Sequence, residues 1–198
     1  IKVNILSLCD GISCLRIALQ RGGHKVDKYF ASEIKKSAIK CSKDNWDDII
    51  RVGDVRNLHF KDGYLYNNDS KWYVGELDLV AFGSPCQSFS SVGHQAGLDD
   101  VRGTLFYEYA RLVSEIQPKV FIYENVRNLL NHNMGRTWKT IKEVFDSLGY
   151  TISYGILNAA DYGIPQNRRR LFVVGTKNGV KVNMPPQKKI LDYKMKDF

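Results

Sequence analysis

The stretch LDLVAFGSPCQSFS, residues 77–90, decides the fold, because its first six residues are nearly all apolar and the rest are mostly small or polar. An apolar run of this length is typical of a strand buried on both faces, as in a parallel sheet covered by helices. A Pro-Cys turn follows and places the thiol of Cys86 just beyond the strand. The stretch therefore predicts an α/β fold with a reactive group at the carboxyl edge of its sheet.

Strand and helix patterns alternate on both sides of this stretch. Apolar runs predict strands at residues 3–8, 26–32, 49–52 and 120–123, and helical spacing predicts helices at residues 34–46, 104–117 and 136–148. A further helix begins near Ile12 and ends at Gly22-Gly23. The last two strands, at residues 150–157 and 171–174, should pair antiparallel at the sheet edge. The alternation predicts a mostly parallel sheet with an antiparallel edge strand and helices on both faces.

Two segments fall outside this alternation. Residues 61–76 are rich in Tyr, Asn, Asp and Gly and are interpreted as a surface insertion. Residues 178–198 are basic, contain Pro185-Pro186 and show no core pattern. We therefore expect one domain over residues 1–177, followed by a basic C-terminal extension.

The composition limits the class of protein. Of the 198 residues, 43% are hydrophobic and 25% charged, which is ordinary for a globular domain that needs no disulfide or metal. No apolar run reaches membrane-spanning length and no signal-peptide pattern is present, so we expect a cytoplasmic protein without membrane contact. The net charge of +8 permits binding to nucleic acid but does not require it.

The four cysteines show no metal-ligand spacing, so a zinc site and a disulfide framework are both unexpected. Cys9, Cys14 and Cys41 are interpreted as small buried hydrophobic residues. Cys86 differs, because it is flanked by Pro85, Gln87 and several serines, and a thiolate at a polar strand end can act as a nucleophile. The glycine-rich loop that follows, residues 88–103, is predicted to be a mobile lid.

Three strand ends carry groups suited to adenosine. The loop Asp10-Gly11-Ile12 gives a tight turn between a strand and a helix, although the full G-x-G-x-x-G fingerprint is absent. Glu33 can accept hydrogen bonds from ribose hydroxyls, and Asp54 can accept one from an adenine amino group. Each alone is more often a cap or turn residue. Together, at adjacent strand ends, they predict an adenosine pocket.

Charged groups also follow the later strands. Glu124 follows the strand at residues 120–123, where a dry pocket would raise its pKa and favour proton donation. The alternative is a carboxylate at a helix N-terminus. Arg168, Arg169 and Arg170 precede the last strand and can neutralise phosphates or hold a base carbonyl, whereas many charge runs are only solvated surface.

In this order, the motifs resemble the DNA cytosine carbon-5 methyltransferases of bacteria and their phages. The resemblance covers residues 7–174 and rests on D-G-I at 10–12, Glu33, Gly53-Asp54, P-C-Q-S-F-S at 85–90, G-L-D-D-V-R-G-T-L-F at 97–106, E-N-V at 124–126 and Q-N-R-R-R at 166–170. It implies a Rossmann-like fold of the kind that S-adenosylmethionine-dependent methyltransferases share, and double-stranded DNA as partner.

The resemblance also implies roles for individual residues. Cys86 would attack carbon 6 of a flipped cytosine, Glu124 would protonate or hydrogen-bond ring nitrogen 3, and Arg168 and Arg170 would hold the base oxygen and backbone. Contacts to S-adenosylmethionine are expected from Asp10, Gly11, Ile12, Glu33, Ile34, Asp54, Val55 and Pro85. Contacts to the substrate DNA are expected from Gln87, Ser90, Val92, Arg102, Asn125 and Arg169.

This sequence departs from the family at several positions. Cys9 stands where the family commonly has an aromatic residue, and Ser13 and Cys14 replace the usual glycines. The family continues after Q-N-R-R-R with a target recognition region and a closing segment, which this chain does not contain. We therefore expect a fragment, a shortened form or half of a split enzyme, with a missing C-terminal segment or a second polypeptide supplying target recognition.

Two other functions are compatible with these motifs. One branch of the family methylates transfer RNA with the same chemistry, and the region that would distinguish the two is missing. A catalytically idle homologue that only binds DNA or a partner enzyme is the other alternative. The intact Cys86, Glu124 and Arg168 argue against it.

Overall fold

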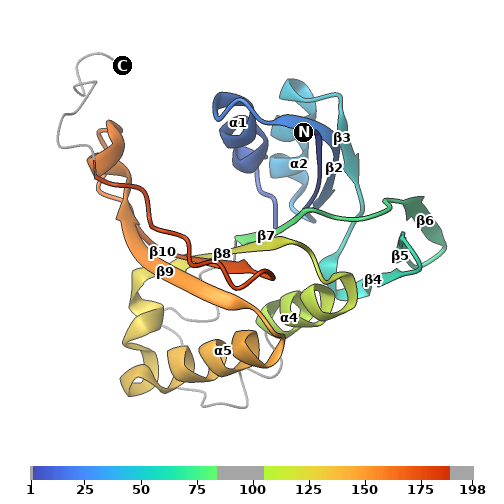
Figure 1. The fold of residues 1–198 in the computed structure, drawn as a ribbon. Helices are drawn as coiled ribbons and strands as arrows, with labels where there is room; N and C mark the ends of the chain where they lie inside the picture. Colours follow the sequence, from blue (N-terminus) through green and yellow to red (C-terminus); the bar gives the residue numbers. More distant parts are fainter. Residues whose placement is uncertain (1, 84–104, 188–198) are drawn as a thin grey trace.

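A seven-stranded sheet runs through the protein in the order β3-β2-β1-β7-β8-β10-β9 (Figure 1). The structure, a computed structural model, describes residues 2–83 and 105–187. The strands are β1 (Lys2–Leu8), β2 (Lys25–Ser32), β3 (Ile49–Arg51), β7 (Leu79–Gly83), β8 (Val120–Val126), β9 (Thr151–Asn158) and β10 (Arg169–Thr176). Each was predicted, with bounds that differ by a few residues at most.

The sheet is mostly parallel, as predicted. Strand β1 pairs in parallel with β2 on one side and β7 on the other, so the strand order reverses between β1 and β7. Strand β10 runs antiparallel to both β8 and β9. The expected antiparallel pair is therefore present, but the reversed strand is β10, and the edge strand β9 runs in the same direction as β8. Ligands of such sheets bind at the carboxyl ends of the strands beside the point of reversal.

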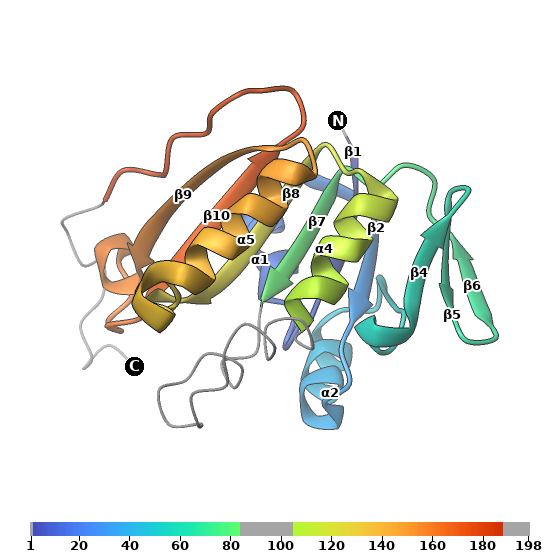
Figure 2. The same cartoon turned by 90° about the horizontal axis from the view of Figure 1, so that it is seen from below.

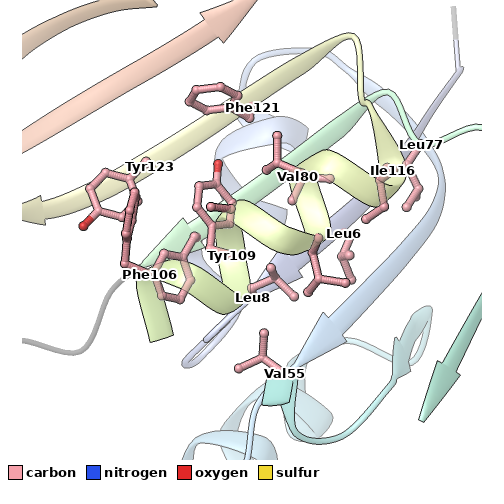
Figure 3. Close-up of a cluster of buried hydrophobic side chains, with 14 of the residues drawn as sticks. Leu6, Leu8, Val55, Leu77, Val80, Phe106, Tyr109, Ile116, Phe121 and Tyr123 are labelled. Carbon is pink, nitrogen blue, oxygen red and sulfur yellow. The ribbon is translucent and has the colours of Figure 1, made fainter. Parts of the chain in front are cut away.

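Helices cover both faces of the sheet (Figures 1 and 2). Helices α1 (Cys14–Arg21) and α2 (Lys36–Asn45) lie on one face, and α4 (Leu105–Ile116) and α5 (Arg136–Ser147) lie on the other. Between α4 and the sheet, Leu6, Leu8, Phe106, Tyr109 and Phe121 are almost completely buried (Figure 3). Burial of this apolar area holds the sheet rigid beneath the site. No helix among residues 2–83 and 105–187 is long and apolar enough to cross a membrane.

The region predicted to be a surface insertion, residues 61–76, belongs to an ordered antiparallel meander. The meander comprises β4 (Leu58–Lys61), β5 (Tyr64–Asn67) and β6 (Ser70–Tyr73). The first hairpin turns at Asp62-Gly63, both with positive φ, which is the turn geometry that an Asp-Gly pair favours. Leu58 and Leu65 are fully buried in the main core. The insertion therefore folds as part of the domain, and its Asp-Gly pair was the signal that could have predicted it.

Short 3-10 helices complete the described chain: η1 (Val55–Asn57), η3 (Arg127–Leu130), η4 (His132–Gly135) and η5 (Ala159–Tyr162). After β10, residues 177–187 lie along β9 (Figure 1). The Val182 N–H donates to Ser153 Oγ at 2.9 Å, and Tyr162 Oη donates to the Pro185 carbonyl at 2.9 Å. The beginning of the predicted basic extension thus lies against the sheet.

Candidate active site

The turns after β1 and β2 are joined by the carboxylate of Glu33. Its Oε2 accepts a hydrogen bond from Gly11 N at 2.8 Å, and its Oε1 accepts from Ile34 N at 2.8 Å and Lys35 N at 2.9 Å. Gly11 has a φ of 60°, in the region that glycine adopts without strain. Three of the predicted cofactor residues are therefore brought together by direct hydrogen bonds.

The side chain of Asp10 supports the first turn from inside the protein. One carboxylate oxygen accepts from Tyr29 Oη at 2.6 Å, and the other accepts from Ser13 Oγ. Ser13 Oγ also lies 2.6 Å from Ser42 Oγ, a buried residue of α2. Through these two bonds Asp10 stabilises the turn, and a direct contact between Asp10 and a cofactor stays a prediction.

The turn after β3 presents Asp54 at the same edge. Hydrogen bonds from Arg56, first of all from its guanidinium, lower the pKa of Asp54. The neighbouring Val55 is 4% exposed and lies in the core, so its side chain is not available to a ligand. In contrast, Ile12 and Ile34 are 49% and 62% exposed beside these carboxylates. The three turns thus offer two acidic acceptors next to apolar side chains.

Cys9 lies among these turns in a half-buried position, with a φ of 52°. Burial, together with the nearby charges of Glu33 and Asp54, raises the pKa of its thiol to about 12. Cys9 is therefore a neutral thiol at physiological pH and not a nucleophile. The expectation that Cys14 and Cys41 are buried is wrong, since both are exposed on helices at the surface.

The second part of the site is a pocket of about 310 Å³ between β8, β10, η5 and residue 185. Its walls include three predicted catalytic residues, Glu124, Arg168 and Arg170. Leu157, Ala159, Tyr162, Phe172 and Pro185 complete the lining. These five were not predicted. Alternation along β10 could have indicated Phe172, but the others come from segments whose place depends on the tertiary fold.

The register of β10 against β8 explains why Glu124 and Arg170 meet. Glu124 is paired with Phe172, and Arg170 lies two residues before Phe172 in β10, on the same face. The Arg170 Nε lies 3.1 Å from Glu124 Oε1. Burial raises the pKa of Glu124, while the positive charges of Arg170 and Arg168 partly oppose that rise. The carboxyl group can therefore hold a proton more readily than an exposed glutamate.

Asn125 points to the opposite face of the sheet and is fully buried. Its Nδ2 donates to Tyr123 Oη at 2.7 Å, and its Oδ1 accepts from Val126 N at 2.7 Å. A contact between this side chain and DNA, as predicted from the sequence, does not agree with that burial. Arg168 and Arg169, in contrast, are exposed.

The strand that leads to Cys86 lies next to the Glu124 pocket. Strands β7 and β8 are neighbours, and Gly83 at the end of β7 is paired with Glu124. Cys86 follows Gly83 by three positions in the sequence. Six predicted site residues, Pro85, Cys86, Gln87, Ser90, Val92 and Arg102, and the predicted lid at residues 88–103 lie outside the residues that the structure describes.

Known proteins similar to this chain agree with these features. A methyltransferase of Bacillus phage SPR, named as the orphan methyltransferase M.SPRI, is 38% identical over 199 residues, which is all of this chain and 42% of that protein. The type II methyltransferase M1.ScrFI of Lactococcus lactis subsp. cremoris is 40% identical over 88% of this chain and 41% of its own length.

A solved structure shares the fold. It is a putative DNA modification methyltransferase encoded within an E. coli prophage, with a TM-score of 0.67 and 28% identity, covering 88% of this chain and 47% of that one. The chain therefore spans less than half the length of these similar proteins. The family model for C-5 cytosine-specific DNA methylases matches residues 3–197. With the motifs, the fold and a match over nearly its whole length, the chain belongs to the C-5 cytosine-specific DNA methylase family.

Proposed function

We propose that the protein transfers a methyl group from S-adenosylmethionine to carbon 5 of cytosine in DNA, through a covalent adduct with Cys86. The observation that carries this proposal is the position of Glu124. This glutamate has a raised pKa, lies in a pocket with Arg168 and Arg170, and is paired with the end of the strand that leads to Cys86. An acid and two cations beside the strand that leads to a cysteine suit covalent activation of a heterocyclic base.

The turns after β1, β2 and β3 fit S-adenosylmethionine. The carboxylates of Glu33 and Asp54 are acceptors of the kind that ribose hydroxyls and an adenine amino group require. The exposed Ile12 and Ile34 offer apolar surface that a flat purine can cover. Among residues 2–83 and 105–187, no atom lies within 4 Å of a Cβ built on Gly11, so these residues leave the backbone of that turn uncovered. When bound, the sulfonium supplies the electrophilic methyl group.

The residues of this chain would carry out the remaining steps. The Cys86 thiolate adds to carbon 6 of a cytosine turned out of the duplex, forming a carbon–sulfur bond. Glu124 gives a proton or hydrogen bond to ring nitrogen 3, so the electron pair released by the addition can collect at carbon 5. Carbon 5 then takes the methyl group. Loss of the carbon 5 proton to a base restores the ring double bond and expels the thiolate.

Arg168 and Arg170 have complementary parts in this scheme. Their charges limit the rise in the pKa of Glu124. As donors they can also hold the base carbonyl, which gains negative charge during the addition. The net charge of +8 favours binding to the DNA backbone. Since the chain spans 42% of the phage relative, we assign target choice to a further segment or to a second polypeptide.

Trapping on an oligonucleotide duplex that carries 5-fluorocytosine tests the proposal. Fluorine replaces the proton whose loss releases the enzyme, so the adduct should persist on a denaturing gel when S-adenosylmethionine is present. Cys86→Ser should abolish the adduct, and Cys14→Ser and Cys41→Ser should retain it. An adduct that forms only on transfer RNA would reassign the substrate. Binding without any adduct would indicate an idle homologue.

A further inference from the structure

The turn between β3 and η1 is held by side chains through each of its three carbonyl groups. Asn67 Nδ2 donates to the Val52 carbonyl at 2.6 Å and to the Asp54 carbonyl at 3.0 Å. Ser32 Oγ donates to the Gly53 carbonyl at 2.7 Å. Gly53 has a φ of 80°, and a Cβ there would lie 2.9 Å from Asn67 Nδ2. The turn that carries Asp54 is thus held by side chains from two different strands, β2 and β5.

Asn67 occupies an unusual place in its strand. Side chains alternate along β5, and Leu65 and Asn67 share the inward face, with exposed fractions of 0% and 9%. An apolar residue is the common choice at such a position, because burying an amide without partners costs free energy. Both N–H groups of this amide are used on the turn. The hydrogen bonds to the turn therefore explain why a polar residue stands at position 67, and packing within the hairpin does not.

The meander that carries Asn67 is itself fixed to the main domain. Arg111 of α4 donates to the Leu58 carbonyl at 2.8 Å, and Glu115 accepts from Phe60 N at 2.8 Å. Leu58 and Leu65 are fully buried. On its other side, the hairpin and the turn border a hollow of about 360 Å³ lined by Arg51, Gly53, Asn67 and Trp72 among others. Asn67 spans from this anchored hairpin to the turn.

We infer that Asn67 is a positioning residue that orients Asp54 for recognition of the adenine amino group, with Ser32 as its counterpart. The inference rests on the proposed function. In this arrangement the meander supports the cofactor site, and through Asn67 it helps the site to discriminate between nucleobases. Losing two donors would let the turn shift, so the Asp54 carboxylate would no longer point reliably at the amino group.

Binding of two nucleosides by the full protein as encoded tests this role. S-adenosylhomocysteine carries the 6-amino group, and its inosine analogue carries a 6-oxo group, which the Asp54 carboxylate would repel. We expect the unaltered protein to prefer the amino form by about 10-fold or more in Kd. Asn67→Ala should reduce that preference to about 3-fold or less, by weakening the amino form alone.

The matched control is Ser70→Ala, because Ser70 lies opposite Asn67 in β6 and is exposed. It should retain the full preference. Equal weakening of both nucleosides by Asn67→Ala would show a general structural role and overturn the inference, as would an unchanged preference. If neither nucleoside binds the unaltered protein, the proposed cofactor site itself fails, which is a separate result.

A second variant covers the case in which Asn67→Ala does not fold. Ser32→Ala removes one atom and frees the Gly53 carbonyl from the opposite side of the turn. If Ser32→Ala lowers the preference for the amino nucleoside and leaves the Kd for the 6-oxo nucleoside unchanged, the result supports the proposed role of Asn67 and Ser32 in holding the turn. An unchanged preference in a folded Ser32→Ala protein would contradict it. Circular dichroism of each variant establishes that it is folded.

Discussion

Glu33 and Glu124 lie at the same carboxyl edge of one sheet, but their carboxylates have different surroundings. Three backbone N–H groups donate to Glu33, and both the backbone N–H and the guanidinium of Arg56 donate to nearby Asp54. Glu124 is desolvated in a pocket, so burial raises its pKa even though Arg170 lies 3.1 Å away. In one half of the edge, hydrogen-bond donors hold the carboxylates in place. In the other half, the raised pKa of Glu124 lets its carboxyl group be protonated more readily.

The difference follows from what each half would do. A carboxylate that binds hydroxyl and amino groups must remain an acceptor, and backbone N–H donors hold it in one orientation. A general acid must give and regain a proton near neutral pH, which requires an environment that does not fully favour the charge. The comparison predicts that changes in the β8–β10 pocket affect turnover, whereas changes in the β1–β3 turns affect cofactor binding.

The largest effect is expected from Glu124→Gln. The amide keeps the shape and the contact to Arg170 but cannot donate a carboxyl proton, so turnover should fall by about 100-fold or more. The Kd for S-adenosylhomocysteine should stay within about 2-fold, below the effect of one lost hydrogen bond. Methylation kinetics and calorimetry measure the two quantities, with Glu143→Gln on α5 as control. Turnover near the unaltered value would remove Glu124 from the mechanism.

A smaller effect, on the cofactor Kd and not on turnover, is expected from Glu33→Ala. Removing this acceptor leaves the N–H groups of Gly11, Ile34 and Lys35 without their partner and removes an acceptor for ribose, so the cofactor Kd should rise by about 10-fold or more. The turnover number at saturating cofactor should change by less than about 3-fold, since the pocket around Glu124 is untouched. Glu76→Ala, at an exposed position, is the control. A loss confined to turnover would reverse the comparison between the two halves.

The smallest effect is on stability and depends on pH. A carboxyl group whose folded pKa is raised stabilises the fold at low pH, and that contribution is lost as the pH rises through the folded pKa. Glu124→Gln mimics the neutral form and avoids this loss. Its Tm should therefore exceed that of the unaltered protein by on the order of 2 °C at neutral pH. This difference in Tm should disappear as the pH falls below the ordinary pKa range of a glutamate side chain.

Thermal melts at several pH values, with Glu143→Gln in parallel, measure this difference. A variant less stable than the unaltered protein at neutral pH would mean that the pair with Arg170 outweighs desolvation. In that case the pocket would favour the charged form of Glu124, as the hydrogen bonds from Arg56 favour that of Asp54, and the two halves of the edge would be alike.

The amino-acid sequence by itself determined the order and type of the main elements. The unbroken apolar run in β7 and the alternation of strands and helices are local patterns, and burial on both faces leaves a parallel sheet as the solution. The same patterns placed Asp10, Glu33 and Asp54 at neighbouring strand ends, because parallel strands expose their carboxyl ends at one edge. The motifs then predicted the family that the comparisons confirm.

Only the tertiary structure decided how these groups are used. Insertion of β10 between β8 and β9 sets Arg170 beside Glu124, and the desolvation that raises the pKa of Glu124 depends on walls drawn from residues 157–185. Burial of Asn125 and the bonds from Asn67 to the turn after β3 likewise join residues on different strands or faces. Register, burial and electrostatic environment arise from contacts between distant segments, which the pattern of any one segment does not contain.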